Sequence, residues 1–339
     1  MQTSGFIGPK TATQFAIALV LLVTFSTGIL VGRHVAGEIR GAVMHAADSV
    51  SGPHFPYQLD QPLRKLILPA ILREASAVSY IDGSQVGIVQ DEQGTLFIYS
   101  LVADRVMREI DFAGQGDYEG LVMDRDEAWV LRSDGTLFHL NGLHGNTLKV
   151  TRLDTHLQDK DDTEGLALDS AHRQLLVGLK GLPKIDGKRR KDKRAVYAFG
   201  LDEQSLSPGP WLLLDTAEIK RVYSSQLPGG AAEKFDADKK SDFQPSDLAV
   251  HPVTGHLYHI AARGQLLVVS DRSGQVYFVR ELPKSVFRQP EGISFDPRGN
   301  LIIVSEGGGS EAVLFEFRYQ PLVRAVEAPA PATTGFGPL

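Results

Sequence analysis

The chain has 339 residues, of which 42% are hydrophobic and 22% are charged, a balance typical of globular proteins. Its formal net charge of −6 makes the protein as a whole a poor electrostatic partner for nucleic acid. It contains no cysteine, which excludes disulfides, thiolate metal sites and a cysteine nucleophile. The 34 glycines and 18 prolines predict many turns and favour an all-β fold.

The N-terminal region contains a long apolar segment. After a short tail (1–10), residues 11–32 read TATQFAIALVLLVTFSTGILVG and carry no charge. This segment is long enough to cross a bilayer as a helix. We interpret it as an uncleaved transmembrane signal anchor, with a cleaved signal peptide as the alternative. Lys10 precedes the span and Arg33 and Arg40 follow it, so charge alone does not decide the orientation. We expect the remainder outside the cytoplasm, because such a segment before a β-domain normally serves export.

After a linker (33–55), residues 56–320 contain a repeat. It is marked by aliphatic triplets at 78–80, 121–123, 166–168, 248–250 and 293–295, with gaps of 43, 45, 82 and 45 residues. Each triplet begins a series of short β-rich runs separated by turn residues. Four strands repeated every 40–50 residues or so are typical of a β-propeller blade. We predict five four-stranded blades; a sixth blade hidden in the long gap and a β-sandwich are the alternatives.

The two ends of the repeat region complement each other. The last unit ends at its third strand, AVLFEFRY (312–319). We expect its missing outer strand to come from YQLDQPLRKLIL (57–68), since pairing the chain ends removes an exposed edge. Residues 321–339 are rich in proline and alanine, and we predict a disordered tail.

Acid–glycine pairs precede three of the triplets, as in GDYEGLVMD (116–124) and DDTEGLALD (161–169). The first strand of a blade lies nearest the propeller axis, so its start should face one mouth of the central channel. The glycine lets the backbone pass close to its neighbours. The position two residues before each triplet therefore predicts an inner ring of Ser76, Glu119, Glu164, Ser246 and Glu291.

Further oxygen ligands are expected at the same mouth. The second strand of a blade returns to this face, so Glu306 at the end of LIIVSE and Asp91 after VGIVQ should join the ring. Asp117 and Asp162 lie two residues before the ring position. In blade four Asp247 stands where glycine is expected, and it should either add a carboxylate or turn outward.

Carboxylates that converge on a channel repel one another, and a cation, bound protons or water-filled separation relieves this cost. A hard divalent ion in an oxygen shell is one solution, and calcium suits a large irregular site better than magnesium. Alternatively, the acids cap turns and accept backbone N–H bonds between blades. The predicted calcium ligands are Glu119, Glu164, Glu291 and Glu306, with Asp117, Asp162, Ser76 and Ser246 as further candidates.

Histidines do not predict a zinc site. The segment HPVTGHLYH contains His251, His256 and His259, but these span a hairpin. His256 and His259 are three residues apart on a strand and should face opposite sides.

The long gap contains two insertions. Residues 180–194, KGLPKIDGKRRKDKR, should join the second and third strands of blade three. Residues 216–242 should join blades three and four, with a short helix at their start. Both should emerge on the face of the acid ring. Residues 184–194 carry seven cations and two acids, which indicates either an anion contact or a solvated hairpin tip.

The motifs resemble those of the bacterial SdiA-regulated family, which is similar to NHL-repeat proteins. They are REASAVSY, GDYEGLVM, DDTEGLAL, QPSDLAVHPVTGHLYHI and QPEGISFDPRGNLIIVSEGGG, over residues 60–320 or so. The resemblance implies a five-bladed propeller with bound calcium and no established biochemical activity. It assigns Glu119, Glu164 and Glu291 to the acidic blade starts and Glu306 to an acid of the last blade. Ala77 and Asp247 depart from the usual glycine.

We expect a non-enzymatic propeller anchored in the bacterial inner membrane and facing the periplasm. Its channel mouth would bind calcium and receive a small ligand or an envelope protein. The alternative is a calcium-dependent hydrolase of the lactonase or phytase kind, with Glu119 or Glu164 as base. The sequence contains no G-x-S-x-G nucleophile motif.

Overall fold

The computed structural model describes residues 55–226 and 243–321, which belong to one compact unit. The predicted span 11–32, together with the tail 1–10 and the linker up to residue 54, lies outside the described residues, as does the predicted C-terminal tail beyond residue 321. Among the residues that are described, no helix combines the length and apolarity needed to cross a membrane.

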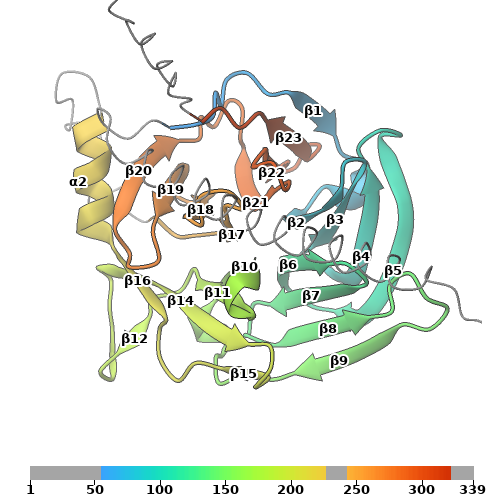
Figure 1. Ribbon diagram of the computed structural model, residues 1–339, viewed down its shortest axis with the longest axis horizontal. Coiled ribbons are helices and arrows are strands. Elements are labelled where there is room, and N and C mark those ends of the chain that lie inside the picture. The colour runs from blue at the N-terminus through green and yellow to red at the C-terminus, as the bar shows by residue number, and fades with distance from the viewer. Residues whose placement is uncertain (1–54, 227–242, 322–339) are drawn as a thin grey trace, which may run out of the picture. The chain divides into compact units, whose positions relative to one another are not determined.

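Five antiparallel sheets stand around a common centre, with the first strand of each innermost (Figure 1). Blade 1 contains β2 (Ala75–Asp82), β3 (Gln85–Gln90), β4 (Gln93–Ser100) and β5 (Arg105–Gln115). Blade 2 contains β6 (Tyr118–Asp124), β7 (Glu127–Arg132), β8 (Leu137–Asn141) and β9 (Lys149–Leu153). Blade 3 contains β10 (Thr163–Asp169), β11 (Gln174–Leu179) and β14 (Lys193–Gly200), with the short strands β15 (Ser205–Leu206) and β16 (Leu212–Asp215) pairing with β14.

Blade 4 contains β17 (Asp247–Val250), β18 (Leu257–Ala261), β19 (Leu266–Ser270) and β20 (Val276–Glu281). Blade 5 contains β21 (Gln289–Phe295), β22 (Leu301–Glu306), β23 (Val313–Phe317) and β1 (Arg64–Ile67). Each inner strand contacts the next one, and β21 contacts β2, so the ring is closed. The predicted five-bladed propeller is confirmed.

The chain ends close the ring through β1, as expected. This strand pairs antiparallel with β23, and Ile67 lies opposite Val313. The backbone N–H of Leu68 donates to the carbonyl of Ala312 at 2.8 Å, which extends the pairing. An unpaired edge of the last blade is thereby covered.

The hydrophobic core is divided into five clusters, each between two neighbouring blades. Alternating side chains of each strand face the two adjacent blades, because a blade buries both of its faces. Between blades 3 and 4, for example, Leu176 packs in one cluster with Leu248. Five clusters of this kind give a rigid frame for residues at the inner strand ends.

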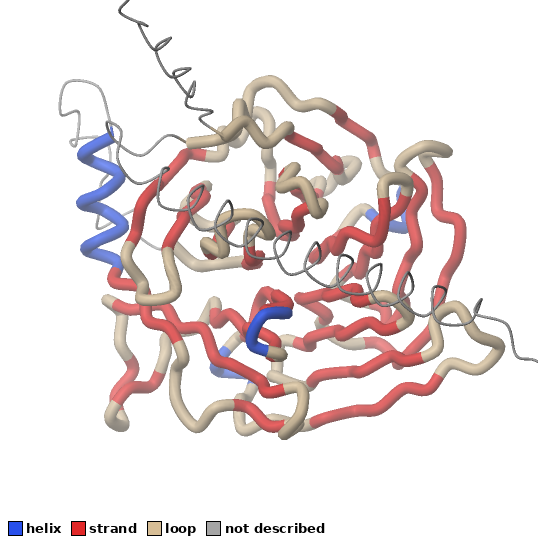
Figure 2. The backbone as a smooth tube through the Cα atoms, in the orientation of Figure 1, coloured by secondary structure: helices blue, strands red, loops and turns tan. Residues whose placement is uncertain are grey.

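The first insertion of blade 3 has the predicted place, and so does the second as far as residue 226, since residues 227–242 lie outside the described residues. The strands β12 (Lys184–Ile185) and β13 (Lys188–Arg189) form a small hairpin between β11 and β14. Helix α2 (Thr216–Gln226) follows β16 and packs against β20 of blade 4, at the edge of the ring (Figure 2). Three short 3-10 helices complete the described elements: η2 (Ala70–Leu72), η3 (Asp159–Asp161) and η4 (Ser170–His172).

Candidate functional site

The predicted ring residues lie at irregularities of the inner strands. The pairing of β6 with β7 shifts its register at Glu119, and that of β21 with β22 shifts at Glu291. The same shift occurs at Glu164–Gly165 in β10 and at Ser76 in β2. A bulged residue lacks a partner in the ladder, and the bulge re-aims its side chain. The bulges therefore give these side chains their common direction.

The glycine after each acid makes room for the neighbouring blade. A Cβ atom on Gly165 would lie 2.7 Å from the Cα of Asp247, and Gly165 has a φ of +96°. A Cβ atom on Gly292 would lie 2.7 Å from the backbone nitrogen of Val78. The prediction that these glycines permit close approach of backbones is confirmed.

All five ring residues line one cavity of about 890 Å³, which we call the acidic mouth. The acids expected from the second strands join them, and Asp117 and Asp162 lie just outside the lining. Seven carboxylates and four cationic side chains line the acidic mouth: Glu74, Asp91, Glu119, Glu164, Glu281, Glu291 and Glu306, with Lys180, Arg263, Lys284 and Arg288.

Five of the seven carboxyl groups of the acidic mouth have raised pKa values: Asp91, Glu119, Glu164, Glu291 and Glu306. Burial, followed by the charges of Glu164 and Asp117, raises the pKa of Glu119 to about 11. Burial is also the main cause that raises the pKa of Glu291 to about 7. Asp91 has a pKa raised to about 6 by burial and by Glu74, and its buried Oδ1 has no hydrogen-bond partner among the described residues. Burial, with repulsion between the acids as a further cause, thus favours the protonated forms of these carboxyl groups.

Lys180 places an ammonium group inside this ring. It follows β11 directly, and its Nζ donates a hydrogen bond to Glu164, which is 4% exposed. Its positive charge also opposes the rise in the pKa values of Glu291 and Glu306. These carboxylates raise the pKa of Lys180 beyond its ordinary range. Burial nevertheless raises the pKa of Glu164 to about 8, because one lysine does not offset the loss of water and the other acids.

Two candidate ligands lie beside the mouth. Asp117 lies beside Glu119 and contributes to the rise in the pKa of Glu119. Asp162, in a left-handed turn with a φ of +51°, lies within electrostatic reach of Lys180. Neither is among the residues that line the cavity.

The two ring serines join neighbouring blades. The hydroxyl of Ser76 donates to the carbonyl of Tyr118 at 2.6 Å, which links blades 1 and 2. The hydroxyl of Ser246 donates to the carbonyl of Pro290 at 2.7 Å, which links blades 4 and 5. The donor capacity of both hydroxyls is thereby used within the frame.

Asp247 neither joins the acidic mouth nor turns outward, which corrects both expectations. Its carboxylate is 2% exposed and accepts backbone N–H bonds from Leu166 at 3.2 Å, Leu248 at 2.8 Å and Ile293 at 2.8 Å. It therefore joins the inner strands of three blades. The alternative reading of the acids, as acceptors of backbone N–H groups between blades, holds at this position.

His251 and His259 are both buried and contact polar groups within the blades. His251 accepts backbone N–H bonds from Val253 and Thr254 at its Nδ1, and its Nε2 lies 2.9 Å from the hydroxyl of Tyr57. The Nε2 of His259 lies 3.4 Å from the hydroxyl of Ser270.

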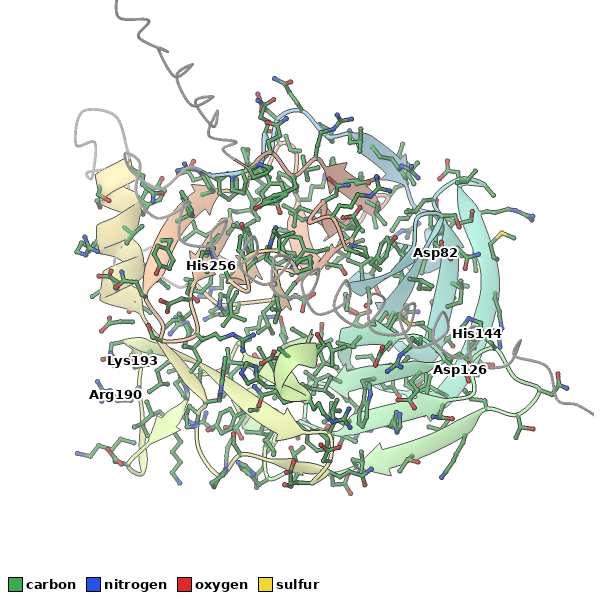
Figure 3. All side chains as sticks on the ribbon, in the orientation of Figure 1. Asp82, Asp126, His144, Arg190, Lys193 and His256 are labelled. Carbon is green, nitrogen blue, oxygen red and sulfur yellow. The ribbon has the colours of Figure 1, made fainter. Side chains whose placement is uncertain are left out.

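Much of the basic segment 184–194 is engaged within the protein. Arg189 pairs with Asp161 at 2.9 Å, and Lys193 pairs with Asp215 at 2.7 Å. Arg190 pairs with Asp192 beside it; Arg190 and Lys193 are labelled at the periphery of the ring in Figure 3. Internal carboxylates thus neutralise part of the positive charge that the sequence concentrates here.

The sequence did not lead us to predict Lys180 as a residue of the acidic mouth. Asp91 and Glu306 were predicted there because they are acids at the point where a second strand ends on the ring face. Lys180 occupies the corresponding place in blade 3, directly after Leu179. A search for any charged residue at this place would have found it.

The carboxylate oxygens of the acidic mouth are suitable calcium ligands, but their present arrangement around Lys180 does not form a calcium site. Carboxylate oxygens are suitable donors, yet the ammonium of Lys180 lies among them. The part of the chain that the structure describes contains no group of three or more acidic or histidine side chains placed to hold a metal ion. Calcium would require Lys180 to leave Glu164.

The chain was compared with known proteins in three ways. Among solved structures, the chain resembles the glutaminyl cyclase of Myxococcus xanthus, with 16% identity, a TM-score of 0.49, and coverage of 77% of this chain and 96% of that one. It resembles a streptogramin B lyase with 9% identity, a TM-score of 0.43, and coverage of 75% and 97%. A search of curated proteins found no match. The model of the SdiA-regulated family matches residues 213–309, from β16 to β22 and beyond, which confirms the predicted resemblance over that part of the chain.

Proposed function

We propose that this propeller, which resembles the SdiA-regulated family, is a binding module. Its acidic mouth binds a positively charged ligand. The observation that carries the proposal is the excess of carboxylates in one cavity of about 890 Å³, where seven acids face four cations. Their raised pKa values mean that burial and repulsion remain uncompensated when no further cation is present. A cationic ligand would relieve that repulsion.

The residues favour binding over hydrolysis. A hydrolase would need a free carboxylate as general base, and the sequence offers Glu119 or Glu164. Glu119 has a pKa raised to about 11, so it holds its proton at neutral pH. Glu164 hydrogen-bonds Lys180 and has a pKa raised to about 8. Glu119 is thus protonated, and Glu164 is already engaged by the ammonium of Lys180.

Calcium stays part of the proposal in a restricted form. Once Lys180 withdraws from Glu164, the carboxylates of Glu119, Glu164, Glu291 and Glu306 would hold the ion. When bound, calcium would supply positive charge that compensates the ring, and no reaction is assigned to it.

Two four-carbon probes of opposite charge test the proposal. We expect 1,4-diaminobutane to bind the full-length protein at pH 7 in calorimetry and to raise its melting temperature, whereas succinate should do neither. Glu291→Gln should weaken diamine binding at least several-fold. The matched control, Glu109→Gln, changes an exposed glutamate on the outer strand β5 and should leave binding unchanged. Preference for succinate, or equal binding by both variants, would overturn the proposal.

We also propose that residues 11–32 anchor the protein in the bacterial inner membrane, with the propeller in the periplasm. The support is the charge-free stretch of 22 residues. In a Gram-negative host, the full chain should resist carbonate extraction from membranes, and deletion of 11–32 should release it. Full extraction of the intact chain by carbonate would contradict the anchor.

A further inference from the structure

The backbone of Lys180 is fixed at the edge of the acidic mouth. Its N–H donates to the carbonyl of Asp162 at 2.8 Å, and the N–H of Gly181 donates to the same carbonyl at 3.3 Å. On the other side, β11 is paired with both β10 and β14. The side chain therefore starts from a rigid point and reaches inward, whereas the exposed side chain of Lys184 lies further along the same insertion.

The ammonium of Lys180 interacts with carboxyl groups of two blades. It donates to Glu164 of blade 3, and its charge also acts on Glu291 and Glu306 of blade 5. The lysine side chain is 33% exposed and Glu164 is 5% exposed, so the pair lies where the cavity meets the buried frame. A cation that entered the mouth from solvent would meet Lys180 at this place.

We infer that Lys180 is a built-in counter-cation that excludes divalent metal ions from the deepest part of the acidic mouth and leaves room only for ligands that bind beside it. This inference rests on the proposed function of the acidic mouth. It gives Lys180 a role in specificity, because a tethered ammonium competes with a metal ion for the same oxygens at an effective concentration that free ions do not reach. Its raised pKa keeps it charged and excludes a role as an amine nucleophile.

The direct test removes the ammonium and measures calcium. At pH 8, where protons compete less for the carboxylates, Lys180→Met should bind calcium at least about ten-fold more tightly than the wild type in calorimetry. Its melting temperature should rise with calcium and fall again with EDTA. Lys184→Met removes an exposed lysine of the same insertion and should behave like the wild type.

Two further variants guard against a folding defect. Lys180→Gln can still donate a hydrogen bond to Glu164, and it should gain calcium affinity as Lys180→Met does. Lys180→Arg keeps the positive charge and should gain none. The inference is overturned if neither neutral variant binds calcium more tightly than wild type, or if the arginine variant gains equally.

The outcome is separable from that of the proposed function. If 1,4-diaminobutane binds the wild type through Glu291 but the neutral Lys180 variants gain no calcium affinity, the inference fails and the binding site stands. If the diamine does not bind while the neutral variants gain calcium, the exclusion by Lys180 stands and the proposed ligand class fails.

Discussion

The two ends of strand β10 carry buried carboxyl groups whose pKa values are shifted in opposite directions. At one end, Asp169 is 1% exposed and receives a bidentate contact from Arg272 at 2.5 and 3.0 Å. His172 and Gln174 add hydrogen bonds at 3.1 and 3.0 Å. Although burial alone would raise it, these partners lower the pKa of Asp169 to about 2.

At the other end of β10, Glu164 is 4% exposed but has Lys180 as its partner among several acids. Its pKa is raised to about 8, mainly by burial. Asp169 thus has cationic and polar partners at both of its oxygens, whereas Glu164 has Lys180 as its one cationic partner among several acids. The Asp169 end is satisfied by the frame, and the Glu164 end is where a cationic ligand has something to add.

The largest expected effect lies at the satisfied end. Asp169→Asn removes the negative charge that Arg272 and His172 contact, and it leaves a half-buried guanidinium without its counterion. We expect a loss of about 3 kcal/mol in the free energy of unfolding, because breaking a buried ion pair costs more than the pair contributes. Urea denaturation at pH 7 measures it.

A matched exposed pair provides the control for Asp169. Asp202 contacts Arg173 at 2.6 Å through two side chains that are mostly exposed. Asp202→Asn should leave the stability nearly unchanged, because exposed ion pairs contribute little. If Asp169→Asn cost no more than this, the contrast between the ends of β10 would be wrong.

The pH dependence of stability should come from the acidic mouth. Glu291 and Glu164 have folded pKa values raised to about 7 and about 8, above the ordinary value of an unfolded glutamate. Between the ordinary pKa of glutamate and these raised values, the folded state binds more protons than the unfolded state. The stabilisation is therefore present at low pH and is lost as the pH rises through 7 and 8. We expect a fall on the order of 2 kcal/mol between pH 6 and pH 9.

The double variant Glu164→Gln/Glu291→Gln tests the source of that fall, because it removes two of the titrating groups. Its stability should fall less steeply than that of the wild type over the same range in urea denaturation, and the remaining fall should come from Glu119, whose pKa is raised to about 11 in the folded state. Asp169 cannot contribute in this window, since its pKa is lowered to about 2 and its stabilisation is lost only in acid. A wild-type profile that rises between pH 6 and pH 9 would refute the proposed protonation of the mouth.

The expected effect at Glu119 has the opposite sign, because its substitution should stabilise the protein. With a pKa raised to about 11, Glu119 is neutral at pH 7 in the folded state but ionised in the unfolded state. Glu119→Gln is neutral in both states, so its free energy of unfolding at pH 7 in urea denaturation should exceed that of the wild type. A loss above about 2 kcal/mol, the size expected for a buried ion pair, would mean that Glu119 is ionised in the folded state.

The sequence predicted the fold well because its signals are local. Triplets, turns and acid–glycine pairs repeat in register, and the strand missing from the last blade reappears as β1. The direction of the ring residues followed from the same register. The charge state of the ring did not, because it depends on which side chains meet across blades. Lys180 and Asp169 lie close to Glu164 in the sequence, yet only their three-dimensional partners separate a frame residue from a site residue.

Proton release on ligand binding tests the central claim most directly. A cation in the acidic mouth must lower the pKa values of Glu291 and Glu164, so it must displace protons held at pH 7. Calorimetry with 1,4-diaminobutane in two buffers of different ionisation enthalpy counts these protons. We predict the net release of about one proton per ligand bound at pH 7, reduced in Glu291→Gln. Binding with no proton release, or with proton uptake, would contradict the account.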